Sequence, residues 1–200
     1  LMATIVGILV LQPDIGMTLM VVLTWGFQMF LAGMPMLLVI CIVALAPLGL
    51  VAAYFTLGHV HKRINQFWEG GAWQVEKARD SFANGGLFGV GPGDGTVKHH
   101  LPDAHSDFIF AVAGEEFGAL ACLTLLTLYA FIVLRGFSRA MSDEGLFYLI
   151  ASASLLLQFG VQAAIHMASS VHLIPTKGMT LPLISYGGSS LVASGLTRGL

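Results

Sequence analysis

The sequence predicts an all-α fold, a polytopic bundle of transmembrane helices. Apolar residues make up 56% of its 200 residues and charged residues only 10%, and the mean hydropathy is +0.82. A water-soluble domain carries about 25% charged residues, so this composition excludes an ordinary soluble enzyme. The formal net charge of −2 argues against a nucleic-acid partner. Cys41 and Cys122 both lie in apolar stretches, which excludes a disulfide scaffold.

Long stretches without charge divide the chain into predicted spans. A helix that crosses a bilayer needs about 20 apolar residues, and no Lys, Arg, Asp or Glu occurs between Ile15 and His61 or between Gly145 and Thr176. The predicted spans are the end of an earlier helix at 1–11, then 15–31, 36–57, 108–137, 145–170, and a helix that begins near Gly187. We therefore expect five to six spans in a single integral-membrane domain over residues 1–200. We expect no signal peptide, and the apolar ends predict a fragment of a longer protein.

Because successive spans reverse direction, the loops between them fall on alternate faces of the membrane. The corner at 12–16, the long loop at about 58–107 and the loop at 171–190 share one face, which carries nearly all the polar residues. Arg135 and Arg139 flank a short loop on the other face, which favours the cytoplasm for that loop. A simple count points the opposite way, because the long loop holds more basic residues. Charge alone leaves the orientation open.

A glycine-rich run in the long loop has two interpretations. Residues 85–95 contain six glycines and are followed by Lys98. Glycine permits positive φ and a close approach of the backbone to a ligand. The run is therefore either a flexible surface turn or a cradle of backbone amides that faces a phosphate or sugar. The tryptophans that precede it, Trp68 and Trp73, fit a position at the membrane interface.

A polar cluster ends the long loop directly before the predicted span at 108–137. Residues 99–107 include three histidines and two aspartates, which could bind a divalent cation or simply be solvated. Asp107 can cap the following helix, because its side-chain oxygen can accept from the free amides of the first turn. The positive end of the helix would also keep this carboxylate ionised, as a base or a metal ligand requires.

Two adjacent acids and a segment rich in proline and glycine are further candidates. Glu115 and Glu116 lie inside an apolar span, where an ionisable side chain is costly and a function is the default hypothesis. The alternative is that they reach the interface by snorkelling. Adjacent residues point about 100° apart on a helix, so at most one should face a cavity. The segment 175–190, which contains Lys177, predicts a broken or re-entrant stretch that lines a cavity.

Several motifs in a fixed order resemble the SEDS family (FtsW/RodA) of bacterial cell-wall polymerases. They are LQPDIG at residues 11–16, the glycine run up to Lys98, LPDAHSDFIF at 101–110, GEEFG at 114–118, and residues 175–190. The resemblance covers essentially the whole chain, as roughly the C-terminal half of a ten-helix protein, and is closer to the FtsW branch. Ser106 stands where the family usually has Thr, and His166 and Ala168 stand where it tends to have Asn and Gly.

The resemblance implies a peptidoglycan glycosyltransferase that polymerises lipid II during cell division. It implies the bacterial cytoplasmic membrane, with the long loop and the active site on the outer, periplasmic side. The implied partners are a class B penicillin-binding transpeptidase and divisome membrane proteins, and the implied cofactor is a divalent cation, Mg or Mn. One alternative is a lipid II flippase or lipid transporter. A third interpretation is an intramembrane serine protease that pairs Ser185, Ser189 or Ser190 with His166 or His172.

The implied chemistry assigns roles to the polar residues of one face. The GlcNAc 4-hydroxyl of the acceptor would attack the anomeric carbon of the donor's MurNAc, with inversion, and undecaprenyl pyrophosphate would leave. Asp107 is the expected catalytic base, and a metal-ligand role is the competing assignment. Lys98 and Lys177 would hold the pyrophosphate. The expected substrate-binding residues are Lys98, His105, Glu115, Glu116, Lys177, Ser185 and Asp14.

Overall fold

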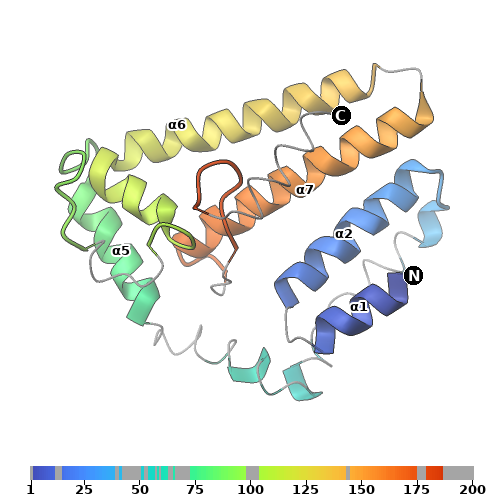
Figure 1. The fold of residues 1–200 in the computed structure, drawn as a ribbon, viewed down its shortest axis with the longest axis horizontal. Helices are drawn as coiled ribbons and strands as arrows, with labels where there is room; N and C mark the ends of the chain where they lie inside the picture. The colour runs from blue at the N-terminus through green and yellow to red at the C-terminus, as the bar shows by residue number, and fades with distance from the viewer. Residues whose placement is uncertain are drawn as a thin grey trace. The chain divides into compact units, whose positions relative to one another are not determined.

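The computed structural model describes residues 2–11, 15–38, 41, 51, 54–56, 58, 60–62, 65, 73–97, 104–142, 145–174 and 179–186. The regular elements in this part of the chain are all helices (Figure 1): α1 (Met2–Leu11), α2 (Ile15–Leu31), α5 (Trp73–Gly85), α6 (Ile109–Ala140) and α7 (Leu146–Ser170). The predicted all-α class is confirmed for these residues. The predicted span at 36–57 is described only in part, and the predicted helix from Gly187 lies outside the described residues.

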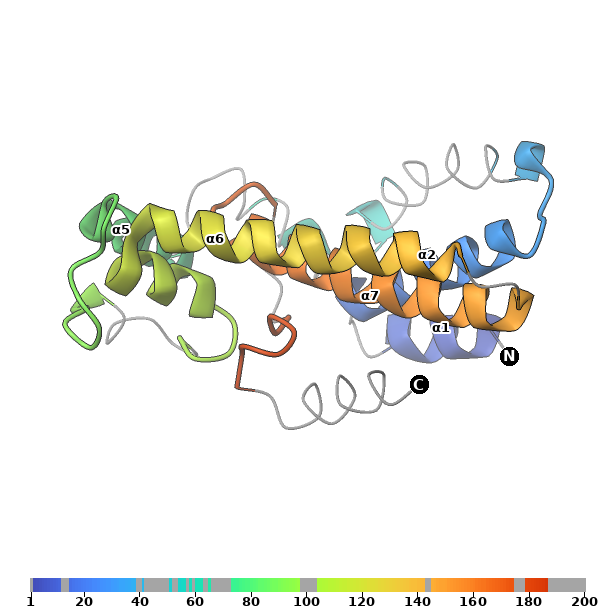
Figure 2. The ribbon, with the colours of Figure 1, turned by 90° about the horizontal axis from the view of Figure 1, so that it is seen from above.

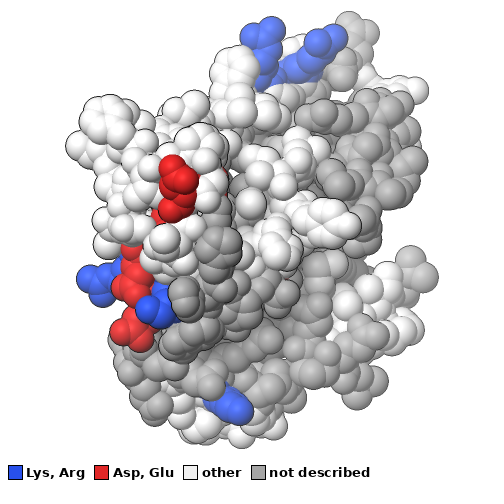
Figure 3. Space-filling model, turned by 60° about the vertical axis from the view of Figure 1, so that its left-hand side comes forward, with Lys and Arg blue, Asp and Glu red and all other residues white. Residues whose placement is uncertain are grey.

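Two of the described helices, α6 and α7, are long and apolar enough to cross a membrane. The helix α2 is apolar but shorter, with 17 residues. Many apolar side chains of α6, such as Leu123, Phe131 and Leu134, are exposed, whereas the core helix of a soluble protein would bury them. Figure 3 agrees, because most of the described part of the face it shows is uncharged. Two spans are therefore supported, and five to six spans stay a prediction.

The chain divides into two compact units, which are described separately. The first comprises Leu1–Glu69 and Gly136–Gln158, and the second comprises Gly70–Arg135 and Phe159–Leu200. Each of the long helices α6 and α7 therefore contributes to both units. The expectation of one domain over residues 1–200 stays a prediction.

Close helix packing characterises the first unit. The helices α1 and α2 contact each other, and α2 ends in a turn where Gly33 has a φ of 94°, as the predicted break after residue 31 requires. The end of α6 packs on the start of α7, and a Cβ atom at Gly136 would lie 2.5 Å from the Leu156 side chain. Glycine at this position therefore permits the close approach that is common between membrane helices.

The second unit contains a helix that the sequence did not predict. The helix α5 lies inside the long loop and beside the first turns of α6 (Figures 1 and 2). Its Ala78 is buried in a cluster with Ala104, Phe108 and Ala111, whereas the opposite side is charged and includes the Lys77–Asp80 ion pair at 3.0 Å. The end of the long loop is thus fixed against α6 by apolar contacts.

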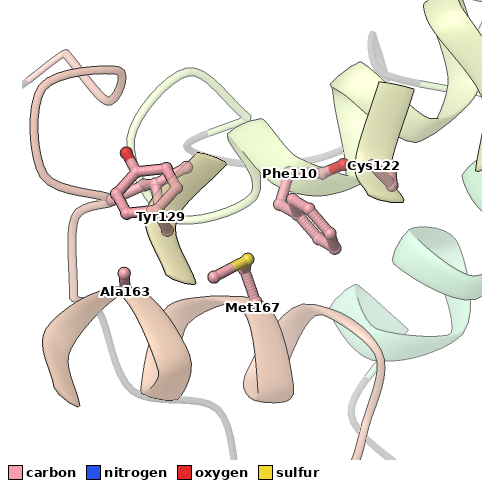
Figure 4. Close-up of a cluster of buried hydrophobic side chains, with 6 residues drawn as sticks. Phe110, Cys122, Tyr129, Ala163 and Met167 are labelled. Atoms are coloured by element: carbon pink, nitrogen blue, oxygen red, sulfur yellow. Dashed lines mark hydrogen bonds between the residues drawn. The ribbon is translucent and has the colours of Figure 1, made fainter. Parts of the chain in front are cut away.

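A second cluster forms the core between α6 and α7 in the same unit. Figure 4 shows Phe110, Cys122 and Tyr129 of α6 on one side and Ala163 and Met167 of α7 on the other. The sixth buried member of the cluster, from the segment that follows α7, is Leu181. The Tyr129 ring also stacks on Phe159 of α7 at 5.3 Å between centroids. The segment after α7 is therefore part of the core and is no mere surface loop.

Candidate active site

Asp107 lies in the turn directly before α6. Residues 104–107 form this turn, and the carbonyl of Phe108 accepts the first helical hydrogen bonds, from Ala111 N at 2.9 Å and Val112 N at 3.1 Å. The side chains of Ala104 and Phe108 are buried, whereas Asp107 is partly exposed and His105 is exposed. The turn therefore has a fixed apolar base and a carboxylate that a ligand can reach. The predicted capping bond from Asp107 stays a prediction.

The segment 179–186, drawn in red in Figure 1, is joined to this turn by two hydrogen bonds. The Ser185 hydroxyl donates to the Ser106 carbonyl at 2.7 Å, and the Tyr186 amide donates to the His105 carbonyl at 3.0 Å. The end of the long loop and the loop after α7 thus contact each other. That the two loops share one face of the membrane stays a prediction.

Side chains of α6 and α7 anchor the same segment from the other side. The Tyr129 hydroxyl donates to the Pro182 carbonyl, and the Gln162 amide donates to the Thr180 carbonyl at 3.0 Å. The third contact joins His166 Nδ1 and the Met179 carbonyl at 2.7 Å. The segment is non-helical and its members Met179, Leu181, Pro182 and Ser185 are buried, so the predicted break in regular structure is confirmed here.

His166 is a residue that the sequence analysis noted as a departure from the family pattern and as a candidate partner of a serine in the protease interpretation. It is 0% exposed, and since a carbonyl oxygen faces Nδ1, that nitrogen carries a proton and donates. The other ring nitrogen, Nε2, is buried and has no hydrogen-bond partner among the described residues. A single histidine in a charge-free span was the signal that could have identified it.

Glu115 is fully buried and holds the loop that precedes the Asp107 turn. Its Oε1 atom accepts from Asn84 Nδ2 at 2.9 Å, Thr96 N at 2.8 Å and Val97 N at 2.9 Å. The side chain is 0% exposed, so the snorkelling alternative is wrong for Glu115. Glu116 is partly exposed, in agreement with the expectation that at most one of the two acids faces inward.

The glycine run replaces helical hydrogen bonds at a break in α6. Gly118 has non-helical angles, φ 79° and ψ −179°, so the helix loses the bonds that Ala119 N and Leu120 N would donate to the carbonyls of residues 115 and 116. Those two carbonyls accept instead from Val90 N at 3.0 Å and Gly91 N at 3.1 Å. In exchange, Ala119 N and Leu120 N donate to the Gly86 and Leu87 carbonyls at 2.9 and 3.3 Å.

Neither sequence interpretation of the glycine run describes this arrangement. The amides of Gly89, Val90 and Gly91 already donate within the protein, so they form no open cradle for a phosphate. A Cβ atom at Gly89 would lie 2.1 Å from the Glu116 carbonyl oxygen, so the run is also no free surface turn. Gly85 and Gly89 are required for close contact with the α6 backbone.

Three predicted site residues, Asp14, Lys98 and Lys177, lie outside the described residues. The same holds for His99, His100 and Asp103 of the predicted polar cluster. Within the described ranges, no three His, Cys, Asp or Glu side chains are grouped so that they could hold a metal ion. The structure thus brings together Asp107, His105 and Ser185, and it places Glu115 beside the glycine run.

The chain is similar to known proteins over its whole length. The model of the FtsW/RodA/SpoVE family, described as "Cell cycle protein", matches residues 1–200. The chain is 42% identical over 198 residues to the "Probable peptidoglycan glycosyltransferase FtsW" of Caulobacter vibrioides, covering 98% of this chain and 51% of the relative. It is 34% identical over 195 residues to the "Peptidoglycan glycosyltransferase RodA" of Mycobacterium leprae, covering 94% and 42%. The chain thus spans about half the length of the curated relatives it matches.

Two solved structures are similar in fold. One is a chain of the structure described as "Structural coordination of polymerization and crosslinking by a peptidoglycan synthase complex". Its TM-score is 0.79 and its identity 28%, and the match covers 98% of this chain and 57% of that chain. The other is an aspartate-to-alanine mutant of the rod shape determining protein RodA of Thermus thermophilus, with a TM-score of 0.64, 28% identity, and coverage of 99% and 52%.

Proposed function

Because this chain belongs to the FtsW/RodA/SpoVE family of cell cycle proteins, we propose that its protein is an inverting peptidoglycan glycosyltransferase that polymerises lipid II. The observation that carries the proposal is the Asp107 turn, which presents a partly exposed carboxylate at the start of an apolar helix and is tied to a buried segment at Ser106. The names of the relatives in both branches support the same activity. The greater identity to an FtsW relative favours a role in cell division.

Asp107 acts as the general base in this reaction. Its carboxylate accepts the proton of the GlcNAc 4-hydroxyl while the oxygen forms a bond to the anomeric carbon of the donor's MurNAc. The bond from that carbon to the pyrophosphate breaks, its electron pair leaves with undecaprenyl pyrophosphate, and the anomeric configuration inverts. Such a base must lie within hydrogen-bond reach of the attacking hydroxyl, so the orientation of Asp107 matters more than its charge alone. Lys98 and Lys177 are our candidates to hold the leaving pyrophosphate.

A divalent cation, Mg or Mn, remains part of the proposal only as an ion that the Asp107 carboxylate would bind. Carboxylate oxygens suit both ions. The described residues near Asp107 do not form a complete set of ligands, so they do not by themselves fit such a site. No step of the reaction above depends on a metal ion.

We propose that the protein lies in the bacterial cytoplasmic membrane with five to six spans in this chain and ten in all. The Asp107 turn and the segment 179–186 would face the periplasm, where lipid II is polymerised. A class B penicillin-binding transpeptidase is the partner we expect, since a similar chain comes from a complex that coordinates polymerization and crosslinking. Divisome membrane proteins are expected partners because of the likeness to FtsW.

The test is polymer formation from lipid II by the purified full-length protein in detergent. We expect Asp107→Asn, which keeps the shape of the side chain and removes the base, to abolish glycan strands without lowering the melting temperature. The matched control is Asp80→Asn, because Asp80 is exposed and pairs only with Lys77 among the described residues. Wild-type strand formation by the Asp107 variant would overturn the assignment. Detergent removes the membrane barrier, so polymer formation also distinguishes this activity from lipid transport.

A further inference from the structure

The Ser185 hydroxyl has both of its hydrogen-bonding roles satisfied inside the protein. It donates to the Ser106 carbonyl at 2.7 Å and accepts from the Leu181 amide at 2.7 Å. A serine hydroxyl has one proton to donate, and Ser185 is only 1% exposed. No donor therefore remains for a sugar or a pyrophosphate, which argues against the substrate-binding role that the sequence predicted.

The acceptor of this bond is directly linked to Asp107. The Ser106 carbonyl and the Asp107 nitrogen belong to one peptide group, and that group is planar. A hydrogen bond that fixes the carbonyl therefore fixes the plane from which the Asp107 Cα and side chain extend. The second bond, from the Tyr186 amide to the His105 carbonyl, holds the preceding peptide group of the same turn.

We infer that Ser185 is a positioning residue that orients the Asp107 carboxylate for its proposed role as base. The inference rests on the proposed function and adds to it a residue that does not touch the substrate. Ser185 can act in this way because its own segment is immobilised by Tyr129 of α6 and by Gln162 and His166 of α7. The position of the Asp107 turn is thereby fixed relative to the two long helices, α6 and α7.

The backbone of the segment supports the same conclusion. Leu183 has a φ of 71°, a left-handed conformation that is unfavourable for a residue with a Cβ atom. Such a residue persists where the surrounding contacts over-determine the backbone. The turn from Leu181 to Ser185 is closed by two further bonds, because the Ser185 and Ile184 amides both donate to the Leu181 carbonyl. The hydroxyl of Ser185 is thus presented by a rigid turn.

The decisive variant is Ser185→Ala, assayed as the purified full-length protein with lipid II. A displacement of about 1 Å in a reacting group can lower a rate by about 100-fold, so we expect kcat to fall by about 10- to 100-fold. KM should change little, because no substrate contact is removed. Ser185→Thr retains the hydroxyl and should restore most of kcat. The matched control is Ser154→Ala, since Ser154 is 2% exposed and donates only to its own helix, at Ile150 O.

Hydrogen–deuterium exchange provides a readout that does not depend on activity. In Ser185→Ala the amides of residues 104–110 should exchange faster than in Ser154→Ala. If wild type forms no polymer, the proposed function fails, and faster exchange would still support the link between Ser185 and the turn. If Ser185→Ala does not fold, Ser185→Cys, with a weaker donor, gives the graded comparison. Unchanged kcat with unchanged exchange, or a rise in KM alone, would overturn the inference.

Discussion

Two segments of the second unit are held in opposite ways. Residues 86–91 of the glycine run are joined to α6 by backbone hydrogen bonds, which take the place of helical bonds at Gly118. The segment 179–186 is joined to the rest of the unit mainly by side chains, from Tyr129, Gln162, His166 and its own Ser185. The first arrangement requires the absence of Cβ atoms, whereas the second requires particular polar groups. Mutations should therefore affect the two segments differently.

The largest effect should come from Gly118→Ala. The backbone at Gly118 has a φ of 79°, and a Cβ atom there would lie 2.4 Å from Gly89 N, so the run could not remain in place. We expect loss of folded protein or a destabilisation of several kcal/mol, on the order of 4, measured as the melting temperature in detergent. Gly93→Ala is the control, because Gly93 also has positive φ but has open space around it. Equal effects of the two changes would show that only backbone angles matter.

A second large effect should come from Glu115→Ala. It removes the buried acceptor shared by Asn84, Thr96 and Val97, and each of the three hydrogen bonds contributes about 1 kcal/mol. We expect a loss of about 3 kcal/mol together with faster amide exchange at residues 96–97. Glu115→Gln keeps one oxygen and should lose about half as much. Glu76→Gln, at an exposed position of α5, should change neither quantity.

Tyr129→Phe tests the side-chain anchors of the other segment. The change keeps the ring and its stacking on Phe159 but leaves the buried Pro182 carbonyl without the Tyr129 hydroxyl. The expected loss is about 1–2 kcal/mol, measured by thermal unfolding. Tyr148→Phe is the matched control, because Tyr148 is exposed. No difference between the two variants would mean that the segment is held by apolar contacts instead.

The smallest effect should come from His166→Asn. An asparagine amide can still donate to the Met179 carbonyl, and its Oδ1 atom takes the place of the buried, unpartnered Nε2 atom. One unpaired acceptor replaces another, so we expect the free energy of unfolding to change by less than about 1 kcal/mol. His166→Leu, which removes the donor, should cost more. A larger loss for the Asn variant than for the Leu variant would contradict this account of the ring.

The sequence predicted the long apolar helices well because their signal is local. The predicted spans 15–31 and 145–170 correspond to α2 and α7 within one residue at each end, whereas the predicted span 108–137 is interrupted at Gly118. The break in α6 was not predicted, since Gly118 looks the same in sequence as Gly136 and Gly160, which instead permit contact with Leu156 and Val133. Only the pairing with the glycine run distinguishes it.

The candidate site was predicted in part for the same reason. Asp107 was identified from its place before an apolar helix and from the family motif, both of which are visible in the sequence. The roles of Ser185 and Glu115 were not, because their partners lie 79 and up to 31 residues away along the chain. The helix α5 was missed because it is polar on one side and lies in a loop, where apolar periodicity is weak.

The exchanged hydrogen bonds at Gly118 also bear on how the protein is made. Without the run, four backbone groups of α6 would lose their hydrogen-bond partners, which is costly wherever water cannot replace those partners. The run precedes α6 in the chain, so a ribosome completes it before the interrupted helix emerges. The backbone groups with which the neighbours of Gly118 pair are therefore already synthesised when this part of α6 emerges.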